Sequence, residues 1–252
     1  MTRTFTPPGT QDAPSLDPEA VASFFDARAR RIDEVGPIRA VIYQDKQGDL
    51  AERRDRAEVE RLLPLLQLDG KQRFLDVGCG TGRWTARVAP HVRHYHGIDF
   101  SAGLLAHALD AHAAQPHCRF TRLGADRLAR QALGDGDFDR ILCAGVAIYL
   151  NDDQLRDMFT GMADVAARGC RIMLREPVGL GRRLTLSEHY SDDLEHEYHA
   201  IYRTEDELEE TLGTTLLPAG FVVRDRGDVY SVADMNNRAE TRQRWLLLER
   251  EE

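Results

Sequence analysis

The sequence predicts an α/β protein built on a doubly wound, mostly parallel sheet. Residues 74–77 form a short apolar run that enters a turn with three alternating glycines, after which helix-forming sequence begins. A second apolar run ends in Asp99, at about the 20-residue spacing from Asp76 that a βαβ unit requires. Further strand-like runs near residues 119–123 and 138–142 continue the alternation of strand and helix that is typical of parallel sheets.

The chain before the glycine-rich turn predicts an arm followed by a helical cap. Residues 1–18 contain four prolines and few large apolar side chains, so we expect a flexible arm. Residues 19–35 and 50–66 have amphipathic patterns that predict helices. Residues 19–68 are therefore interpreted as an N-terminal helical cap or lid, and residues 69–252 as the core.

The second half of the core predicts two helices, an insertion and closing strands. Helices are expected at residues 151–167 and 204–212, the first after a fourth strand and before a fifth at 170–174. An insertion at about residues 178–203 breaks the periodicity and concentrates ring-bearing and basic side chains, which suggests a segment that faces a substrate. The last apolar runs, at residues 221–230 and 242–248, complete a seven-stranded sheet with an antiparallel closing strand.

The composition is that of an ordinary globular protein, with 42% hydrophobic and 30% charged residues. A formal net charge of −9 argues against a broad grip on nucleic acid, which needs a surplus of basic side chains. No apolar run approaches the roughly 20 residues that span a bilayer, so we expect a cytoplasmic protein without membrane contact. The four cysteines lack metal-ligand spacing, and His94 and His96 lack a third ligand, so no metal site is predicted.

The glycine-rich turn favours a particular kind of ligand. Asp76 lies two residues before Gly78, and Gly80 and Gly82 follow at alternate positions, where glycine lets the backbone approach a ligand closely. The negative charge of Asp76 would repel the diphosphate of a nicotinamide cofactor. An acidic strand end is suited instead to a ligand that carries a cationic amine.

The order of these landmarks across residues 60–180 resembles that of the class I S-adenosylmethionine-dependent methyltransferases. The resemblance implies a Rossmann-like fold with S-adenosylmethionine as cofactor and S-adenosylhomocysteine as its product. Asp99 has the spacing of a carboxylate that hydrogen-bonds a ribose, and the ring of Phe100 is suited to packing against adenine. In the resembled family, an acid at the place of Asp126 accepts from the adenine amino group, and the fourth strand passes beneath the transferable methyl. The predicted cofactor-binding residues are Asp76, Gly78, Gly80, Gly82, Asp99, Phe100, Ala125, Asp126 and Cys143.

The sequence specifies the methyl acceptor's site less sharply, because methyl transfer from a sulfonium requires positioning more than any particular residue. Tyr149 follows the fourth strand where many relatives carry a histidine, so that histidine's role is not carried over. The other candidates lie at the end of the fifth strand, in the insertion, or between the cap helices. The predicted catalytic residues are Glu176, Tyr149 and His189, and the predicted substrate-binding residues are Tyr43, Arg175, Tyr198 and Arg203.

The predicted function is methyl transfer to an oxygen or nitrogen of a small molecule, such as a secondary metabolite, a sugar or an amino-acid derivative. RNA or protein methylation is an alternative, although the arginines at positions 53, 54, 56 and 61 are interleaved with acids, as in a salt-bridged helix. A non-catalytic S-adenosylmethionine-binding subunit is another alternative. The sequence leaves a monomer and a homodimer equally open.

Overall fold

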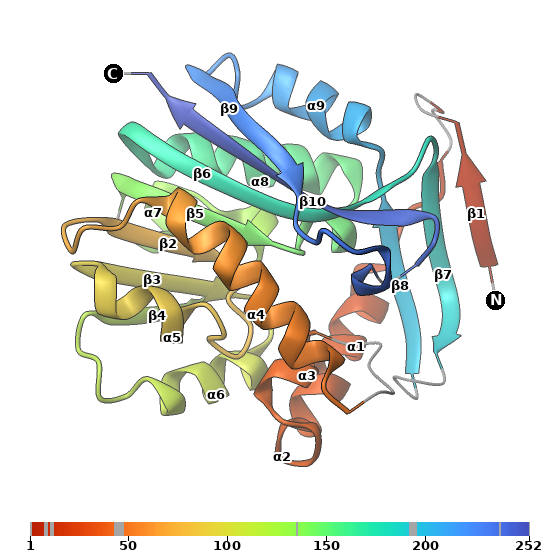
Figure 1. The fold of residues 1–252 in the computed structure, drawn as a ribbon, viewed down its shortest axis with the longest axis horizontal. Helices are drawn as coiled ribbons and strands as arrows, with labels where there is room; N and C mark the ends of the chain where they lie inside the picture. The colour runs from red at the N-terminus through yellow and green to blue at the C-terminus, as the bar shows by residue number, and fades with distance from the viewer. Residues whose placement is uncertain are drawn as a thin grey trace.

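The core is a seven-stranded sheet with strand order β4-β3-β2-β5-β6-β10-β9 (Figure 1). The computed structural model describes residues 2–7, 10, 13–42, 48–134, 136–191, 196–236 and 238–251. Strands β2 to β6 run parallel, whereas β10 is antiparallel to both of its neighbours, which confirms the predicted fold class. The strands are β2 (Arg73–Val77), β3 (His94–Asp99), β4 (Cys118–Arg122), β5 (Phe138–Ala144), β6 (Ala166–Gly179), β9 (Phe221–Asp228) and β10 (Thr241–Arg250).

Alternate residues of the central strands supply two separate hydrophobic cores. On β2, Phe74 packs with α4 (Leu50–Leu62), its 3-10 continuation η1 (Leu63–Leu66) and α5 (Thr85–Val88). Leu75 points to the other face, where α8 (Asp152–Val165) and α9 (Glu205–Thr214) lie. Because successive strand residues face opposite sides, helices on both faces bury the central strands of the sheet. The shorter elements are η2 (Ala89–His91), α6 (Ala102–Ala111), η3 (Ala125–Arg127), α7 (Arg130–Leu133), η4 (Ala147–Tyr149) and η5 (Ala233–Met235).

A second, three-stranded sheet differs from the predicted flexible arm and irregular insertion. Strand β1 (Thr2–Thr6) pairs antiparallel with β7 (Arg183–Ser191), which pairs with β8 (His196–Tyr202). Residues 2–6 are therefore ordered within the predicted arm, and much of the insertion is a hairpin. The pairing joins segments about 180 residues apart in the sequence, so no local pattern near the N-terminus indicates it.

The N-terminal helices divide between the lid and the core. Helices α1 (Pro18–Arg30), α2 (Ile32–Val35) and α3 (Pro37–Val41) lie beside the three-stranded sheet, where Phe24 packs edge-to-face on Tyr198 at 5.5 Å between ring centroids (Figure 1). Helix α4 instead packs on the seven-stranded sheet. No helix in the described part of the chain has both the length and the apolarity to cross a membrane.

Two helical glycines provide a test of the packing beneath the site. A Cβ on Gly161 of α8 would lie 2.1 Å from the Leu128 carbonyl oxygen, whereas a Cβ on Gly213 of α9 would meet nothing within 4 Å. We expect Gly161→Ala to lower the free energy of unfolding by about 2 kcal/mol, because backbone must move to accommodate the methyl group. Gly213→Ala is the matched control and should be neutral or stabilising by about 1 kcal/mol. Urea unfolding checks both, and equal effects would contradict the tight α8 contact.

Candidate active site

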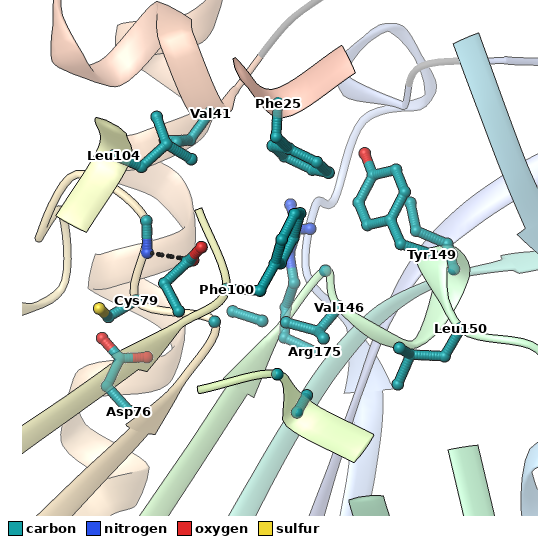
Figure 2. Close-up of a pocket in the computed structure, with 18 of the residues that line it drawn as sticks. Phe25, Val41, Asp76, Cys79, Phe100, Leu104, Val146, Tyr149, Leu150 and Arg175 are labelled. Atoms are coloured by element: carbon teal, nitrogen blue, oxygen red, sulfur yellow. Dashed lines mark hydrogen bonds between the residues drawn. The ribbon is translucent and has the colours of Figure 1, made fainter. Parts of the chain in front are cut away.

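A cavity of about 500 Å³ lies at the carboxyl ends of strands β2 to β6. The glycine-rich turn and the ends of β3 and β4 form one side, and the segment after β5, the end of β6 and strand β8 form the other. Phe25 of α1 and the end of α3 cover it (Figure 2). This is the position at which ligands bind in open α/β sheets.

The glycine-rich turn fits closely beneath the segment that follows β5. Gly78 has a φ of +73°, and a Cβ at this position would lie 2.3 Å from the Cγ2 atom of Val146. Its backbone N–H donates to the Ile98 carbonyl oxygen at 2.8 Å, and the Gly80 N–H donates to Asp99 Oδ2 at 2.9 Å (Figure 2). Only glycine meets both the conformational and the steric requirement at position 78.

Asp76 and Asp99 give this side of the cavity a buried acidic pair. The Tyr95 hydroxyl donates to Asp76 Oδ2 at 2.5 Å, and the Ser101 N–H donates to Asp99 Oδ1 at 2.8 Å. Burial raises the pKa of Asp76 to about 7 and the pKa of Asp99 to about 6. A buried carboxylate with a raised pKa is stabilised in its ionised form by a positively charged ligand.

The remaining predicted cofactor residues divide into two groups. Phe100, Ala125 and Asp126 line the cavity, and the Phe100 ring lies edge-to-face with Phe25 at 5.5 Å between centroids. Cys143, also predicted to bind the cofactor, is not among the residues that line the cavity. Its side chain is fully buried, with Sγ 3.7 Å from Glu176 Oε1, because it lies on the face of β5 that packs against α8.

Glu176 and Arg203, predicted as base and substrate clamp, hold the segment after β5 and are not among the residues that line the cavity. Glu176 Oε1 accepts from the N–H groups of residues 145, 146 and 147 at 3.0 to 3.2 Å. Arg203 donates to the carbonyl oxygens of Ala147 and Leu150 at 2.8 and 2.7 Å, and it also pairs with Asp152. Both side chains therefore form hydrogen bonds with the backbone segment that carries Tyr149.

The other residues predicted to contact the methyl acceptor differ in whether they line the cavity. Tyr149, Arg175 and Tyr198 line the cavity. His189, predicted as a catalytic base, lies on β7 and is not among the lining residues. Tyr43 lies outside the described residues.

Three tyrosine hydroxyls form a chain on the acceptor side. The hydroxyl oxygens of Tyr149 and Tyr198 are 3.3 Å apart, and those of Tyr198 and Tyr202 are 3.1 Å apart. Tyr202 lines the cavity and was not predicted, although its spacing of four residues from Tyr198 places both on one face of strand β8. Tyr149 is half-buried, whereas the other two rings are almost fully buried, so Tyr149 is the accessible end of the chain.

A buried ion network joins α4 to both sides of the cavity, and this too was missed by sequence reasoning. Glu58 Oε1 accepts from Arg83 Nη2 at 2.6 Å, and Glu58 Oε2 lies 2.7 Å from Arg175 Nη2. Arg83 Nη1 also donates to Asp55 at 2.8 Å. The sequence suggested ion pairs within the helix. Asp55 and Glu58 instead lie on one face of α4 and pair with arginines outside this helix.

The residues present fit S-adenosylmethionine. The glycine-rich turn has no room for a side chain at Gly78. The acidic pair of Asp76 and Asp99 is suited to a ligand with a cationic amine and ribose hydroxyls. Among the described residues, no group of three side chains has the arrangement of a metal site.

Comparison with known proteins supports this interpretation. Residues 74–169 match a family model described as a methyltransferase domain. Phosphoethanolamine N-methyltransferase 1 from Haemonchus contortus, solved with phosphoethanolamine and S-adenosylhomocysteine, has a similar structure with a TM-score of 0.68 and 18% identity. The match covers 93% of this chain and 50% of that one, so this chain spans about half the length of that enzyme. A search of curated proteins finds no significant match.

Two further solved structures are similar over nearly the whole length of both chains. Magnesium protoporphyrin IX methyltransferase from Synechocystis, with bound S-adenosylmethionine, has 19% identity and a TM-score of 0.60, and the match covers 96% of this chain and all of that one. The [4+2]-cyclase SpnF has 19% identity and a TM-score of 0.65, with 94% and 98% covered. At these identities the likeness shows the fold. Residues 74–169 carry a methyltransferase domain, and this match and the fold are both consistent with the class I S-adenosylmethionine-dependent methyltransferases.

The raised pKa values of Asp76 and Asp99 predict a pH-dependent affinity for S-adenosylhomocysteine, which retains the cationic amine. A cation favours the ionised carboxylates, so binding releases protons, and affinity increases as pH rises through about 6 to 7. We expect the affinity to fall about tenfold between about pH 8 and about pH 5.5. Titration calorimetry at several pH values checks this.

Asp99→Asn should flatten the pH dependence, because only Asp76 would still titrate. Glu176→Gln is the matched control, since burial also raises the pKa of Glu176 to about 7 but its carboxylate lies outside the cavity. That variant should keep the wild-type profile. An affinity that does not change with pH in the wild type would contradict an acidic pair that meets the cation.

Proposed function

We propose that this protein transfers a methyl group from S-adenosylmethionine to an oxygen or nitrogen of a small molecule. The observation that carries the proposal is the enclosed aromatic wall opposite the acidic pair. Phe25, Tyr149, Tyr198 and Tyr202 come from α1, η4 and β8, and all line the same cavity as the glycine-rich turn. An acceptor in this chamber is surrounded by protein, which favours a small substrate over a macromolecule.

The acidic side of the cavity is proposed to hold the cofactor. In this assignment Asp76 faces the cationic amine, Asp99 accepts from the ribose hydroxyls, and Phe100 packs on the adenine. Ala125 and Asp126 meet the edge of the adenine ring. Gly78, Gly80 and Gly82 supply the turn that allows the close approach of the ligand to the backbone.

The chain's contribution to the reaction is proposed to be positioning. Bound S-adenosylmethionine supplies a methyl group already activated on a sulfonium. The Tyr149 hydroxyl, fixed by its contact with Tyr198, is suited to orient the nucleophile and to receive a hydrogen bond from its N–H or O–H group. Glu176 and Arg203 act as positioning residues, because they hold the backbone of residues 145–150 from both sides.

The alternatives are less well supported. The basic residues of α4 that would contact RNA include Arg54, which is buried, and the helix also uses Asp55 and Glu58 for internal pairs. A role without methyl transfer is suggested by the likeness to the [4+2]-cyclase SpnF, because a [4+2] cyclisation is a different reaction from methyl transfer. We infer a soluble cytoplasmic enzyme whose partner is a small methyl acceptor, as monomer or homodimer.

A methyl-transfer assay with labelled S-adenosylmethionine and a panel of hydroxyl- and amine-bearing metabolites tests the proposal. With any acceptor found, Tyr149→Phe should lower kcat at least about tenfold, because the nucleophile loses its hydrogen-bond partner, while affinity for S-adenosylhomocysteine is unchanged. Tyr190→Phe, at an exposed position of β7, is the control and should retain full activity. Tight cofactor binding with no transfer to any acceptor would favour the non-catalytic alternative.

A further inference from the structure

Arg175 presents one part of its guanidinium to the cavity without a partner. Nη2 makes the ion pair with Glu58 Oε2 at 2.7 Å and donates to the Tyr230 hydroxyl at 3.3 Å. Nε is buried and has no hydrogen-bond partner among the described residues. Nη1 lies 3.4 Å from the position that a Cβ on Gly145 would occupy, and it makes no hydrogen bond or ion pair within the described part of the chain. Arg175 lines the cavity.

Glu58 orients this guanidinium but is shared with other donors. Its second oxygen accepts from Arg83 Nη2 at 2.6 Å and from Trp84 Nε1 at 3.2 Å. The carboxylate is fully buried, and the Arg175 side chain is only 12% exposed, so neither group exchanges its partners for water. Arg175 is therefore a fixed cation whose Nη1 donors are left for a ligand.

The sheet order places Arg175 away from the predicted cofactor residues. Asp76 and Asp99 end β2 and β3, whereas Arg175 lies on β6, with β5 between β2 and β6. Two strand spacings correspond to about 10 Å. Gln243 of β10, which pairs with Pro177 of β6, lines the cavity on this same side.

We propose that the methyl acceptor carries an anionic group, a carboxylate or a phosphate, which binds Arg175 Nη1. This deepens the proposed function and rests on it. Hydrogen bonds between a guanidinium and such an anion are charge-assisted, and they are strong where water is excluded. A wholly apolar acceptor would displace water from the Nη1 donors and leave them unsatisfied, which is unfavourable.

Matched pairs of small probes test the proposal by titration calorimetry on protein saturated with S-adenosylhomocysteine. The pairs are benzoate with benzamide and phenyl phosphate with phenol, which differ in the anionic group and share a ring that fits the aromatic wall. We expect the wild type to bind the anionic member of at least one pair about tenfold more tightly. Arg175→Gln should reduce this preference to less than about twofold. Equal affinities within both pairs in the wild type would overturn the proposal.

Two variants separate loss of the site from loss of the fold or of charge alone. Arg175→Lys keeps a cation for Glu58, so we expect this variant to fold and to bind S-adenosylhomocysteine normally. It should lose most of the preference for anionic probes, because one ammonium group cannot replace the several donors of the planar guanidinium. Arg182→Gln removes an equal charge from the exposed guanidinium that stacks on Phe5 at 4.0 Å, and it should retain the preference. An equal loss in Arg182→Gln would overturn the proposal, because general electrostatics would then explain the effect.

The anion could also come from the amino-acid carboxylate of the cofactor, and a further titration distinguishes the two sources. S-adenosylhomocysteine carries that carboxylate and 5′-methylthioadenosine lacks it. We expect Arg175→Gln to leave the affinity ratio of these two ligands unchanged, and a selective loss of S-adenosylhomocysteine affinity would assign the anion to the cofactor and overturn the proposal. All of these experiments measure binding. A negative result in them can therefore be distinguished from a negative result in the methyl-transfer assay.

Discussion

The pairing of the fully buried Glu58 carboxylate with two guanidinium groups is the interaction on which the site depends. Arg83 follows the glycine-rich turn and Arg175 lies on β6, so one side chain of α4 links the two sides of the cavity. Breaking a buried ion pair typically costs about 3 to 5 kcal/mol, because the remaining charge is left uncompensated. Helix α4 therefore belongs to the framework of the site together with the seven-stranded sheet, whereas α1 to α3 pack with the three-stranded sheet.

A second constraint fixes the backbone that carries Tyr149. Glu176 satisfies three consecutive N–H groups, and Arg203 satisfies two carbonyl oxygens of the same segment. Buried backbone groups that are paired with charged side chains rather than with a strand cannot move without losing strong hydrogen bonds. Val146 packs closely against Gly78, so this segment is in contact with the glycine-rich turn. This contact fixes the position of one side of the cavity relative to the other.

The sequence predicted the parts of the protein whose cause is local. The alternation of strands and helices, the glycine-rich turn and the positions of Asp76 and Asp99 follow from apolar runs, turn residues and fixed spacings. The structure places Glu176 and Arg203 against the backbone of the segment after β5, and the sequence could not indicate this, because a charged residue near a strand end has the same local pattern whether it contacts a ligand or the backbone. Their partners are determined by contacts about 30 to 55 residues away in the chain. The same limit applies to Glu58, whose helical pattern cannot indicate that it pairs with Arg175.

The distribution of charge across β5 connects these features to function. Asp76 and Asp99 make one side of the cavity acidic, and Arg175 makes the other side cationic, although both sides are buried. In a medium of low dielectric constant, opposite fixed charges on two walls orient a polar ligand strongly. A cationic methyl donor on the acidic side and an anionic acceptor on the cationic side would each meet a complementary wall, and their reactive atoms would be directed toward the segment that follows β5. Tyr149, which we propose orients the nucleophile, lies on that segment and lines the cavity.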